Sequence, residues 1–306
     1  MNPKPETFYS NGKLLLTGEY VVLDGAIALA VSTKFGQSMK VTPNSESNIV
    51  WRSLDENESI WFENEFLISD ILSNSSKSQN DVSNRLSQIL QEARILNPKF
   101  LSEMHGYNIT TKLDFPKNWG LGTSSTLINN IANWANVNAF ELLIKTFGGS
   151  GYDIACAQHD APITYQLISN KPEVTEVAFN PSFKDKLYFV YLNKKQNSRE
   201  GIAHYKSNRS NIFKDISALN KTTLELIDCD NLCEFQRLIE AHEQIISTII
   251  GQKPVKDLLF ADFQGSIKSL GAWGGDFVLV VSKENPSDYF KSKGFDIIIS
   301  YRDLIK

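Results

Sequence analysis

The segment from Gly106 to about residue 136 constrains the fold most, because it joins a strand pattern to a helix pattern through a glycine turn. Apolar and polar residues alternate over 106–115, which predicts a strand that stops at Pro116. Gly120 and Gly122 follow, and helical spacing begins near residue 124. The first N–H groups of a helix have no intrahelical partner and lie at its positive end, so this turn predicts a cradle for phosphate.

Hydroxyl side chains stand directly after these glycines. Glycine lets the backbone approach a ligand closely, and the Ser124 hydroxyl oxygen suits Mg²⁺ as a ligand. The pattern differs from the P-loop, G-x-x-x-x-G-K-[ST], because no lysine follows the glycines. The alternative interpretation is an ordinary Ser or Thr N-cap at the start of a helix.

Two further glycine clusters precede regular elements. Glycines at 148, 149 and 151 stand before Asp153 at the predicted start of a short helix, where a carboxylate would either meet a bound substrate or cap the helix. The cluster 271–275 precedes the apolar run 277–281, and glycines ahead of a strand often form only a turn or bulge.

The rest of the chain mixes short apolar runs with helical spacing and predicts an α+β protein of two domains. Strands are expected at 13–17, 20–23, 26–31, 37–42, 48–52, 59–63, 163–168, 187–192, 277–281 and 295–300. Helices are expected at 82–93, 124–136, 139–147, 199–228, 231–250 and 286–293. A hairpin turn at Asp24-Gly25 and a Ser/Asn-rich loop over 73–84 are also predicted. The connection 170–182 is the predicted boundary between domains 1–180 and 181–306.

Charge and composition narrow the partners. The formal net charge is -4 over 306 residues, with no long basic run, which argues against nucleic acid and anionic membranes as partners. No apolar run approaches the roughly 20 residues that span a bilayer. An odd number of cysteines and no apolar N-terminal signal predict a cytoplasmic protein. The expected partner is a small-molecule substrate, and the expected state is a monomer or a homodimer. Cys229 and Cys233 are predicted to share one face of a helix, either as a metal or redox pair or as buried small side chains.

Four segments together resemble the motifs of the GHMP kinases, the family named for galacto-, homoserine, mevalonate and phosphomevalonate kinases. Residues 11–25 resemble the first motif, G-K-x-x-L-x-G-E-[YH]-x-V, and 116–125 resemble the second, P-x-x-x-G-L-G-S-S. Residues 268–276 resemble the third, in the G-A-x-G-G-D form typical of the phosphomevalonate kinase branch. Residues 150–153 resemble the S-G-x-D element of the mevalonate branch.

This resemblance implies a two-domain GHMP kinase fold. The N-terminal domain would be like the second domain of ribosomal protein S5 and would bind ATP, and the C-terminal domain would be ferredoxin-like. ATP would lie between them. The implied activity is Mg²⁺- and ATP-dependent phosphoryl transfer to a mevalonate-type metabolite in the mevalonate pathway of isoprenoid biosynthesis, with 5-phosphomevalonate ahead of mevalonate.

The resemblance also implies roles for individual residues. Lys13 matches the catalytic lysine and Asp153 matches the base. Ser124 matches the serine that binds phosphate and Mg²⁺, and Glu141 lies near the offset of the Mg²⁺-binding glutamate, although a first-turn glutamate can simply stabilise its helix. The phosphate-binding turn would comprise Gly120, Leu121, Gly122, Thr123, Ser124 and Ser125.

Departures from the family pattern leave alternatives open. Trp273 stands where the third motif usually has glycine, and its indole would either crowd the site or form part of the acceptor pocket. A phosphorylated acceptor needs further cations, for which Lys117, Arg199 and Lys268 are candidates unless they are solvated surface charges. The competing functions are a sugar or homoserine kinase, a diphosphomevalonate decarboxylase and a non-catalytic binding module with the same fold.

Overall fold

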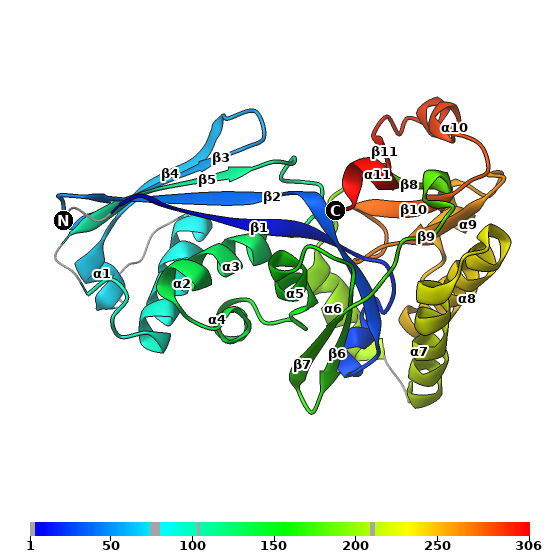
Figure 1. Ribbon diagram of the computed structural model, residues 1–306, viewed down its shortest axis with the longest axis horizontal. Helices are drawn as coiled ribbons and strands as arrows, with labels where there is room; N and C mark the ends of the chain where they lie inside the picture. Colours follow the sequence, from blue (N-terminus) through cyan, green and yellow to red (C-terminus); the bar gives the residue numbers. More distant parts are fainter. Residues whose placement is uncertain (1–3, 74–79, 103–104, 209–211) are drawn as a thin grey trace. The chain divides into compact units, whose positions relative to one another are not determined.

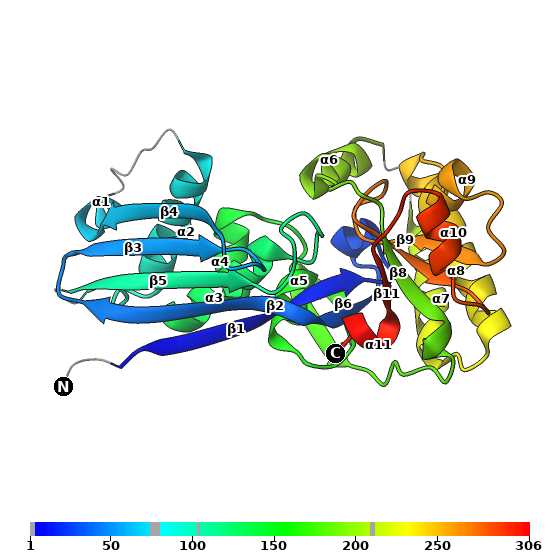
Figure 2. The same cartoon turned by 90° about the horizontal axis from the view of Figure 1, so that it is seen from above.

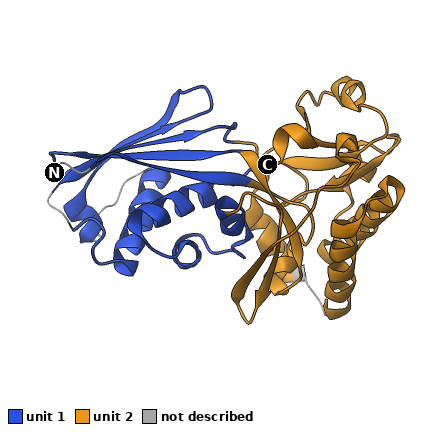
Figure 3. Ribbon diagram, in the orientation of Figure 1, with its two compact units in different colours: residues 1–12, 35–117, 121–158 blue, residues 13–34, 118–120, 159–306 orange. Residues whose placement is uncertain are grey.

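The computed structural model describes residues 4–73, 80–102, 105–208 and 212–306. The chain forms two compact units, coloured separately in Figure 3. Unit 1 comprises 1–12, 35–117 and 121–158, and unit 2 comprises 13–34, 118–120 and 159–306. Two long strands, β1 (Glu6–Leu15) and β2 (Ala28–Asn44), contribute residues to both units. The boundary at residue 180 divides the chain in another way and stays a prediction.

Unit 1 contains a mixed sheet in the order β4-β3-β5-β2, whose strands run side by side in Figure 2. Its strands are the second part of β2 with β3 (Asn48–Leu54), β4 (Ile60–Leu67) and β5 (Gly106–Leu113). β5 is antiparallel to β2, with Gln37 opposite Leu113, and parallel to β3, with Ile49 opposite Tyr107. Side chains alternate between the two faces of a strand, so every second residue of β3 is buried.

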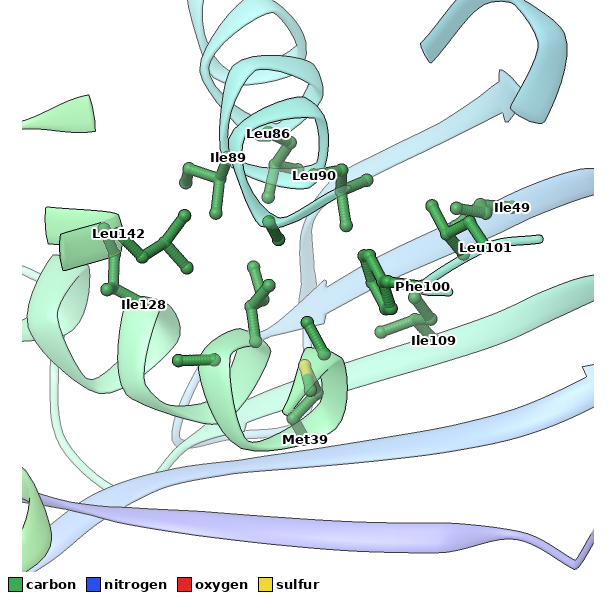
Figure 4. Close-up of a cluster of buried hydrophobic side chains, with 14 of the residues drawn as sticks. Met39, Ile49, Leu86, Ile89, Leu90, Phe100, Leu101, Ile109, Ile128 and Leu142 are labelled. Atoms are coloured by element: carbon green, nitrogen blue, oxygen red, sulfur yellow. The ribbon is translucent and has the colours of Figure 1, made fainter. Parts of the chain in front are cut away.

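Helices cover one face of this sheet (Figure 1). They are α1 (Ile68–Leu72), α2 (Asp81–Leu96), α3 (Thr123–Ala135), α4 (Ala139–Thr146) and α5 (Tyr152–Gln158). The core lies between the layers, where Met39 and Ile109 from the strands meet Leu90 of α2 and Ile128 of α3 (Figure 4). Burial of these apolar side chains fixes the helices on the sheet.

Unit 2 contains a second, antiparallel sheet in the order β11-β8-β10-β9. These strands are β8 (Leu187–Tyr191), β9 (Ser266–Ser269), β10 (Phe277–Val281) and β11 (Ile298–Ser300). Every residue of β10 is buried, which explains its continuous apolar sequence. β6 (Ile163–Ile168) and β7 (Lys171–Glu176) also belong to unit 2, where β6 pairs with the first part of β2.

The helices of unit 2 are longest in the middle of its sequence. They are α6 (Ser198–Asn208), α7 (Phe213–Asp228), α8 (Leu232–Ile250), α9 (Val255–Leu259), α10 (Ser287–Ser292) and α11 (Tyr301–Leu304). Two 3-10 turns, η1 (Val21–Asp24) and η2 (Lys184–Lys186), complete it. α7 and α8 pack side by side, and α8 packs on β9 (Figure 1). In the described part of the chain, no helix is both long and apolar enough to cross a bilayer.

Several predicted elements differ from the structure. Of the predicted strands 26–31 and 37–42, residues 28–31 and 37–42 belong to the single strand β2, and the predicted connection 170–182 contains β7. The apolar run 20–23 is not a strand: Tyr20 has φ +62 and precedes η1, whose last residue, Asp24, is followed by Gly25 as the C-cap rather than by a hairpin partner. The short elements β9, α9 and α11 were not predicted.

Two other predictions concern segments where helices begin or end. Cys229 follows the last residue of α7, and Cys233 lies in α8. The Asn231 side chain accepts the Glu234 N–H and so starts a new helix between them. The two cysteines therefore do not share a helix face. Of the predicted loop 73–84, residues 74–79 lie outside the described part, while Asn80 caps α2.

Candidate active site

The start of α3 supports the phosphate cradle expected from the sequence. Gly122 is the N-cap and has φ +97, a left-handed conformation that favours glycine. No side chain caps this helix, and its first backbone bond runs from the Thr126 N–H to the Gly122 carbonyl at 3.0 Å. The alternative of a Ser or Thr N-cap is therefore excluded. The N–H groups of the first turn have no intrahelical acceptor, so they can donate to an anion at the positive end of the helix.

The two adjacent serines of this turn have different environments. The Ser125 hydroxyl is buried and donates to the Gly122 carbonyl at 2.8 Å. Ser124 is exposed. Ser125 thus stabilises the turn from inside, whereas Ser124 is accessible to a ligand.

A chain of buried polar side chains lies beneath the turn, all within unit 1. The Thr126 hydroxyl donates to Gln37 Oε1 at 2.8 Å, and Asn130 Nδ2 donates to the Gln37 carbonyl at 2.9 Å. Ser10 Oγ donates to Asn130 Oδ1 at 2.8 Å and accepts from Asn129 Nδ2 at 2.9 Å. These bonds fix α3 to the strands at its N-terminal half. The sequence analysis missed them, and the only available signal was the polar pair Asn129-Asn130 inside an amphipathic helix.

Asp153 lies in the first turn of α5, as predicted. Gly151 has φ +93, and its carbonyl accepts the Ile154 and Ala155 N–H groups at 3.0 and 3.1 Å, so it starts the helix. Gln158, at the other end of α5, donates to Asn129 of α3 at 2.8 Å. Asp153 is partly buried and therefore accessible from one side.

Glu141 is exposed in the first turn of α4. The Asn138 side chain accepts the N–H groups of Phe140 and Glu141 at 2.9 and 3.3 Å, so Asn138 caps the helix. A first-turn glutamate also stabilises a helix through the dipole. Among the described residues, no group of three or more His, Cys, Asp and Glu side chains forms a metal site. A role for Glu141 in binding Mg²⁺ stays a prediction.

Lys13 lies on β1 in the part that belongs to unit 2, and its side chain is partly buried. Its Nζ donates to the Gly120 carbonyl at 3.1 Å. Gly120 has φ +70, so the glycine turn depends on a left-handed conformation at this position too. The predicted catalytic lysine is thereby joined to the first glycine of the second motif.

Lys268 is not a solvated surface charge, in contrast to one of the predicted alternatives. It is fully buried in unit 2, where its Nζ donates to Glu19 and lies 3.8 Å from Glu243 Oε2. His242 completes the cluster by accepting the Gly18 N–H at 3.0 Å through Nε2. Burial raises the pKa of Glu19 to about 7 and also raises the pKa of Glu243, while burial and then Lys268 lower the pKa of His242. Lys268 is therefore a counterion to carboxylates and does not serve as a cation for an acceptor.

Trp273 stands in the third glycine segment, and its surroundings belong to unit 2. Its side chain is buried in an apolar cluster of unit 2 that includes Tyr20, Val21 and Tyr205. Its backbone N–H donates to Tyr20 Oη at 3.1 Å. The indole therefore contributes to the core that holds the first motif, which explains how a large residue is tolerated in a glycine segment.

The two other candidate cations are exposed. Lys117, in unit 1, places its ammonium 4.4 Å from the centre of the Trp61 ring, a cation–π contact. Arg199, in unit 2, is the second residue of α6, and its backbone N–H donates to Asn197 Oδ1 at 3.1 Å. A role for either side chain in binding an anion stays a prediction.

Comparison with solved structures identifies the fold. Mevalonate kinase from Methanococcus jannaschii is similar with a TM-score of 0.70, covering 96% of each chain at 16% identity. Streptococcus pneumoniae phosphomevalonate kinase, in complex with phosphomevalonate and AMPPNP, is similar with a TM-score of 0.71, covering 96% of this chain and 99% of that one at 16% identity. The chain has the GHMP kinase fold.

Other members of the fold are nearly as similar. Lactococcus lactis galactokinase complexed with galactose gives a TM-score of 0.66, covering 95% of this chain and 89% of that one at 16% identity. No protein-family model and no curated protein sequence matches the chain. The GHMP kinase fold expected from the four motifs and the α+β class expected from the strand and helix patterns are both confirmed.

Proposed function

We propose that this protein is an ATP-dependent kinase of a small metabolite. The observation that carries the proposal is the start of α3, where Gly122 caps the helix in a left-handed conformation and Ser124 is exposed. A helix start without a side-chain cap binds phosphate through its N–H groups and dipole. The GHMP kinase fold, shared with a neighbour whose structure contains AMPPNP, supports the same function.

The residues present fit a magnesium–nucleotide complex. Mg²⁺ takes oxygen ligands, and the Ser124 hydroxyl is the exposed oxygen donor of the first turn of α3. Glu141 is the second ligand in this proposal. ATP supplies the transferable phosphoryl group, and Mg²⁺ neutralises part of its charge.

Two side chains would act on the reacting groups. Asp153 would accept the proton of an acceptor hydroxyl, or would orient an acceptor phosphate that is already ionised. Lys13 would stabilise the negative charge that moves with the phosphoryl group. Both roles belong to the proposal, as do the cytoplasmic location and the monomeric or homodimeric state.

For the acceptor, we propose a mevalonate-type compound of isoprenoid biosynthesis, with 5-phosphomevalonate ahead of mevalonate. The G-A-x-G-G-D form of the third motif supports this order. A phosphorylated acceptor brings roughly two negative charges at neutral pH. Because Lys268 is engaged with Glu19, Lys117 and Arg199 are the remaining candidates to bind that phosphate.

A coupled ADP-release assay with mevalonate, 5-phosphomevalonate, homoserine and galactose tests the proposal. We expect the highest kcat/KM with 5-phosphomevalonate. A preference for mevalonate above about tenfold, or 1.4 kcal/mol of transition-state binding, would reverse the proposed order. Turnover of galactose or homoserine alone would replace the mevalonate-type acceptor. ATP binding in calorimetry without turnover of any acceptor would indicate a binding module, and absence of ATP binding would refute the kinase.

A further inference from the structure

Asp276 closes the third glycine segment and has none of the roles proposed above. Its φ is +52, a left-handed conformation that Asp and Asn adopt more readily than other residues with a side chain. Its N–H donates to the Lys194 carbonyl at 2.7 Å, and its carbonyl accepts the Leu192 N–H at 2.8 Å. The backbone of Asp276 is therefore fixed at two points to the segment that follows β8.

The side chain of Asp276 is directed at Gly120. A Cβ added to Gly120 would lie 2.3 Å from both Cγ and Oδ2 of Asp276, far inside van der Waals contact. The other carboxylate oxygen, Oδ1, accepts the Gln196 N–H at 3.2 Å. The carboxylate thus occupies the space that only a glycine at position 120 leaves open.

The segment 118–120 is held from its other sides as well, again within unit 2. The Gly120 carbonyl accepts from Lys13 Nζ at 3.1 Å. The Trp119 ring meets Phe277 edge to face with centroids 5.5 Å apart, and Tyr191 Oη donates to the Asn118 carbonyl at 3.1 Å. Movement of the Asp276 side chain would therefore be transmitted through Gly120 to Lys13.

Asp276 and Lys13 also interact electrostatically. Burial raises the pKa of Asp276, and the Gln196 N–H, Lys13 and Lys195 oppose that effect in this order. Burial and then the negative charge of Asp276 also raise the pKa of Tyr191 in β8. The carboxylate of Asp276 therefore attracts the ammonium of Lys13 across a partly buried space.

We propose that Asp276 is a positioning residue, which holds Gly120 and the ammonium group of Lys13 in the arrangement that phosphoryl transfer requires. The inference rests on the proposed kinase function. Asp276 acts through Lys13 and Gly120, and it does not itself contact the reacting groups.

Asp276→Asn is the principal test. Asparagine tolerates the left-handed conformation and keeps an oxygen for the Gln196 N–H, but it removes the charge. We expect an unchanged Tm, a kcat lower by about tenfold or more and a nearly unchanged KM for ATP, because the alignment of Lys13 changes rather than nucleotide binding. The acid limb of the kcat–pH profile should also change. Asp262→Asn, which removes an exposed carboxylate of unit 2 that pairs with Lys293, is the control and should behave as wild type.

Competitive acylation of lysines, read by mass spectrometry, gives a readout that needs no turnover. Without the neighbouring carboxylate, a larger fraction of the Lys13 amine is deprotonated, so Lys13 should be labelled faster in Asp276→Asn while Lys221 on α7 is unchanged. Gly120→Ala, whose added methyl displaces the carboxylate, should reproduce the faster labelling of Lys13 and serves if the first variant does not fold.

The outcomes separate this inference from the proposed function. Wild-type kcat, pH profile and Lys13 labelling in a folded Asp276→Asn protein would overturn the inference. If the wild-type protein turns over no acceptor, the proposed function fails. Asp276 then has no role in catalysis, even where labelling shows its electrostatic effect on Lys13.

Discussion

The ammonium group of Lys268 donates to the carboxylate of Glu19, and both side chains are completely excluded from solvent. Glu243 Oε2 and the second oxygen of Glu19 have no hydrogen-bond donor among the described residues. Two buried carboxylates therefore share one buried cation. This arrangement joins the first motif, through Glu19, to the residues that begin the third.

Removing the cation alone should destabilise unit 2 severely. At pH 8, where Glu19 is ionised, Lys268→Met leaves Glu19 and Glu243 buried without a counterion, and we expect a loss of about 3–5 kcal/mol in the free energy of unfolding. The double variant Lys268→Met with Glu19→Gln should recover part of that loss. Urea denaturation measures both, and Lys221→Met on the exposed face of α7 is the control. A single variant as stable as wild type would contradict the assignment of the ion pair.

The same cluster predicts a pH dependence of stability. Burial raises the pKa of Glu19 from 4.5 to about 7, so between these values the folded protein keeps a proton that the unfolded chain releases. This contribution is complete below pH 4.5 and is lost as the pH rises through 7. The lowered pKa of His242 acts in the opposite direction below its ordinary value of 6.5.

Comparison with Glu19→Gln isolates the carboxyl group. The free energy of unfolding of the variant, relative to wild type, should increase as the pH rises from about 5 to about 8. Urea midpoints measured across that range test the sign. A difference that stays constant, or that decreases, would show that Glu19 is ionised throughout.

The adjacent serines of α3 form a matched pair. Ser124→Ala should leave stability unchanged and raise the KM for ATP and the Mg²⁺ requirement, because Ser124 is exposed at the helix start. Ser125→Ala should instead cost about 1 kcal/mol of stability, since it removes the bond to the Gly122 carbonyl. Thermal unfolding and steady-state kinetics of both variants decide which hydroxyl meets the ligand. If Ser125→Ala raises the KM for ATP and Ser124→Ala lowers stability instead, Ser125 is the residue that contacts the ligand.

Gly122→Val should abolish nucleotide binding. A β-branched residue does not readily adopt φ +97, and its side chain would block the approach of phosphate to the backbone. Gly294→Val imposes similar strain at φ +86, where nothing lies within 4 Å of an added Cβ. Calorimetry with ATP should therefore show binding in the control only. Wild-type affinity in folded Gly122→Val would place the phosphate elsewhere.

Asp153→Asn should lower kcat by about 10²–10⁴-fold, the usual contribution of a general base. The substitution keeps the shape of the side chain in the first turn of α5, so ATP affinity and Tm should be nearly unchanged. Near-normal turnover in the folded variant would remove Asp153 from the mechanism.

Local sequence patterns predicted the structural features that depend on residues close together in the sequence. The glycines and hydroxyls of 120–125 predicted the start of α3 within a residue, because φ at Gly122 and the first turn of the helix are local properties. Contacts distant in sequence were not accessible in this way. Whether Lys268 is exposed depends on Glu19, 249 residues away, and the contact of Asp276 with Gly120 depends on the pairing of distant segments.

The sequence also misjudged residues whose conformation depends on the tertiary structure. Tyr20 to Leu23 has the composition of a strand, yet Tyr20 adopts φ +62 and its hydroxyl accepts the Trp273 N–H. Trp273 looked like an obstacle in a glycine loop because its apolar neighbours come from other parts of unit 2.

The interleaving of the two units has a practical consequence for dissecting the protein. Each unit is assembled from three separate stretches of chain, so no single proteolytic cut or stop codon releases either one intact. A fragment ending at residue 180 would contain residues 13–34, and with them Glu19, but not Lys268. The remaining fragment would contain Lys268 without the carboxylate that pairs with it. Exchange of one unit between related proteins would therefore require several coordinated crossovers.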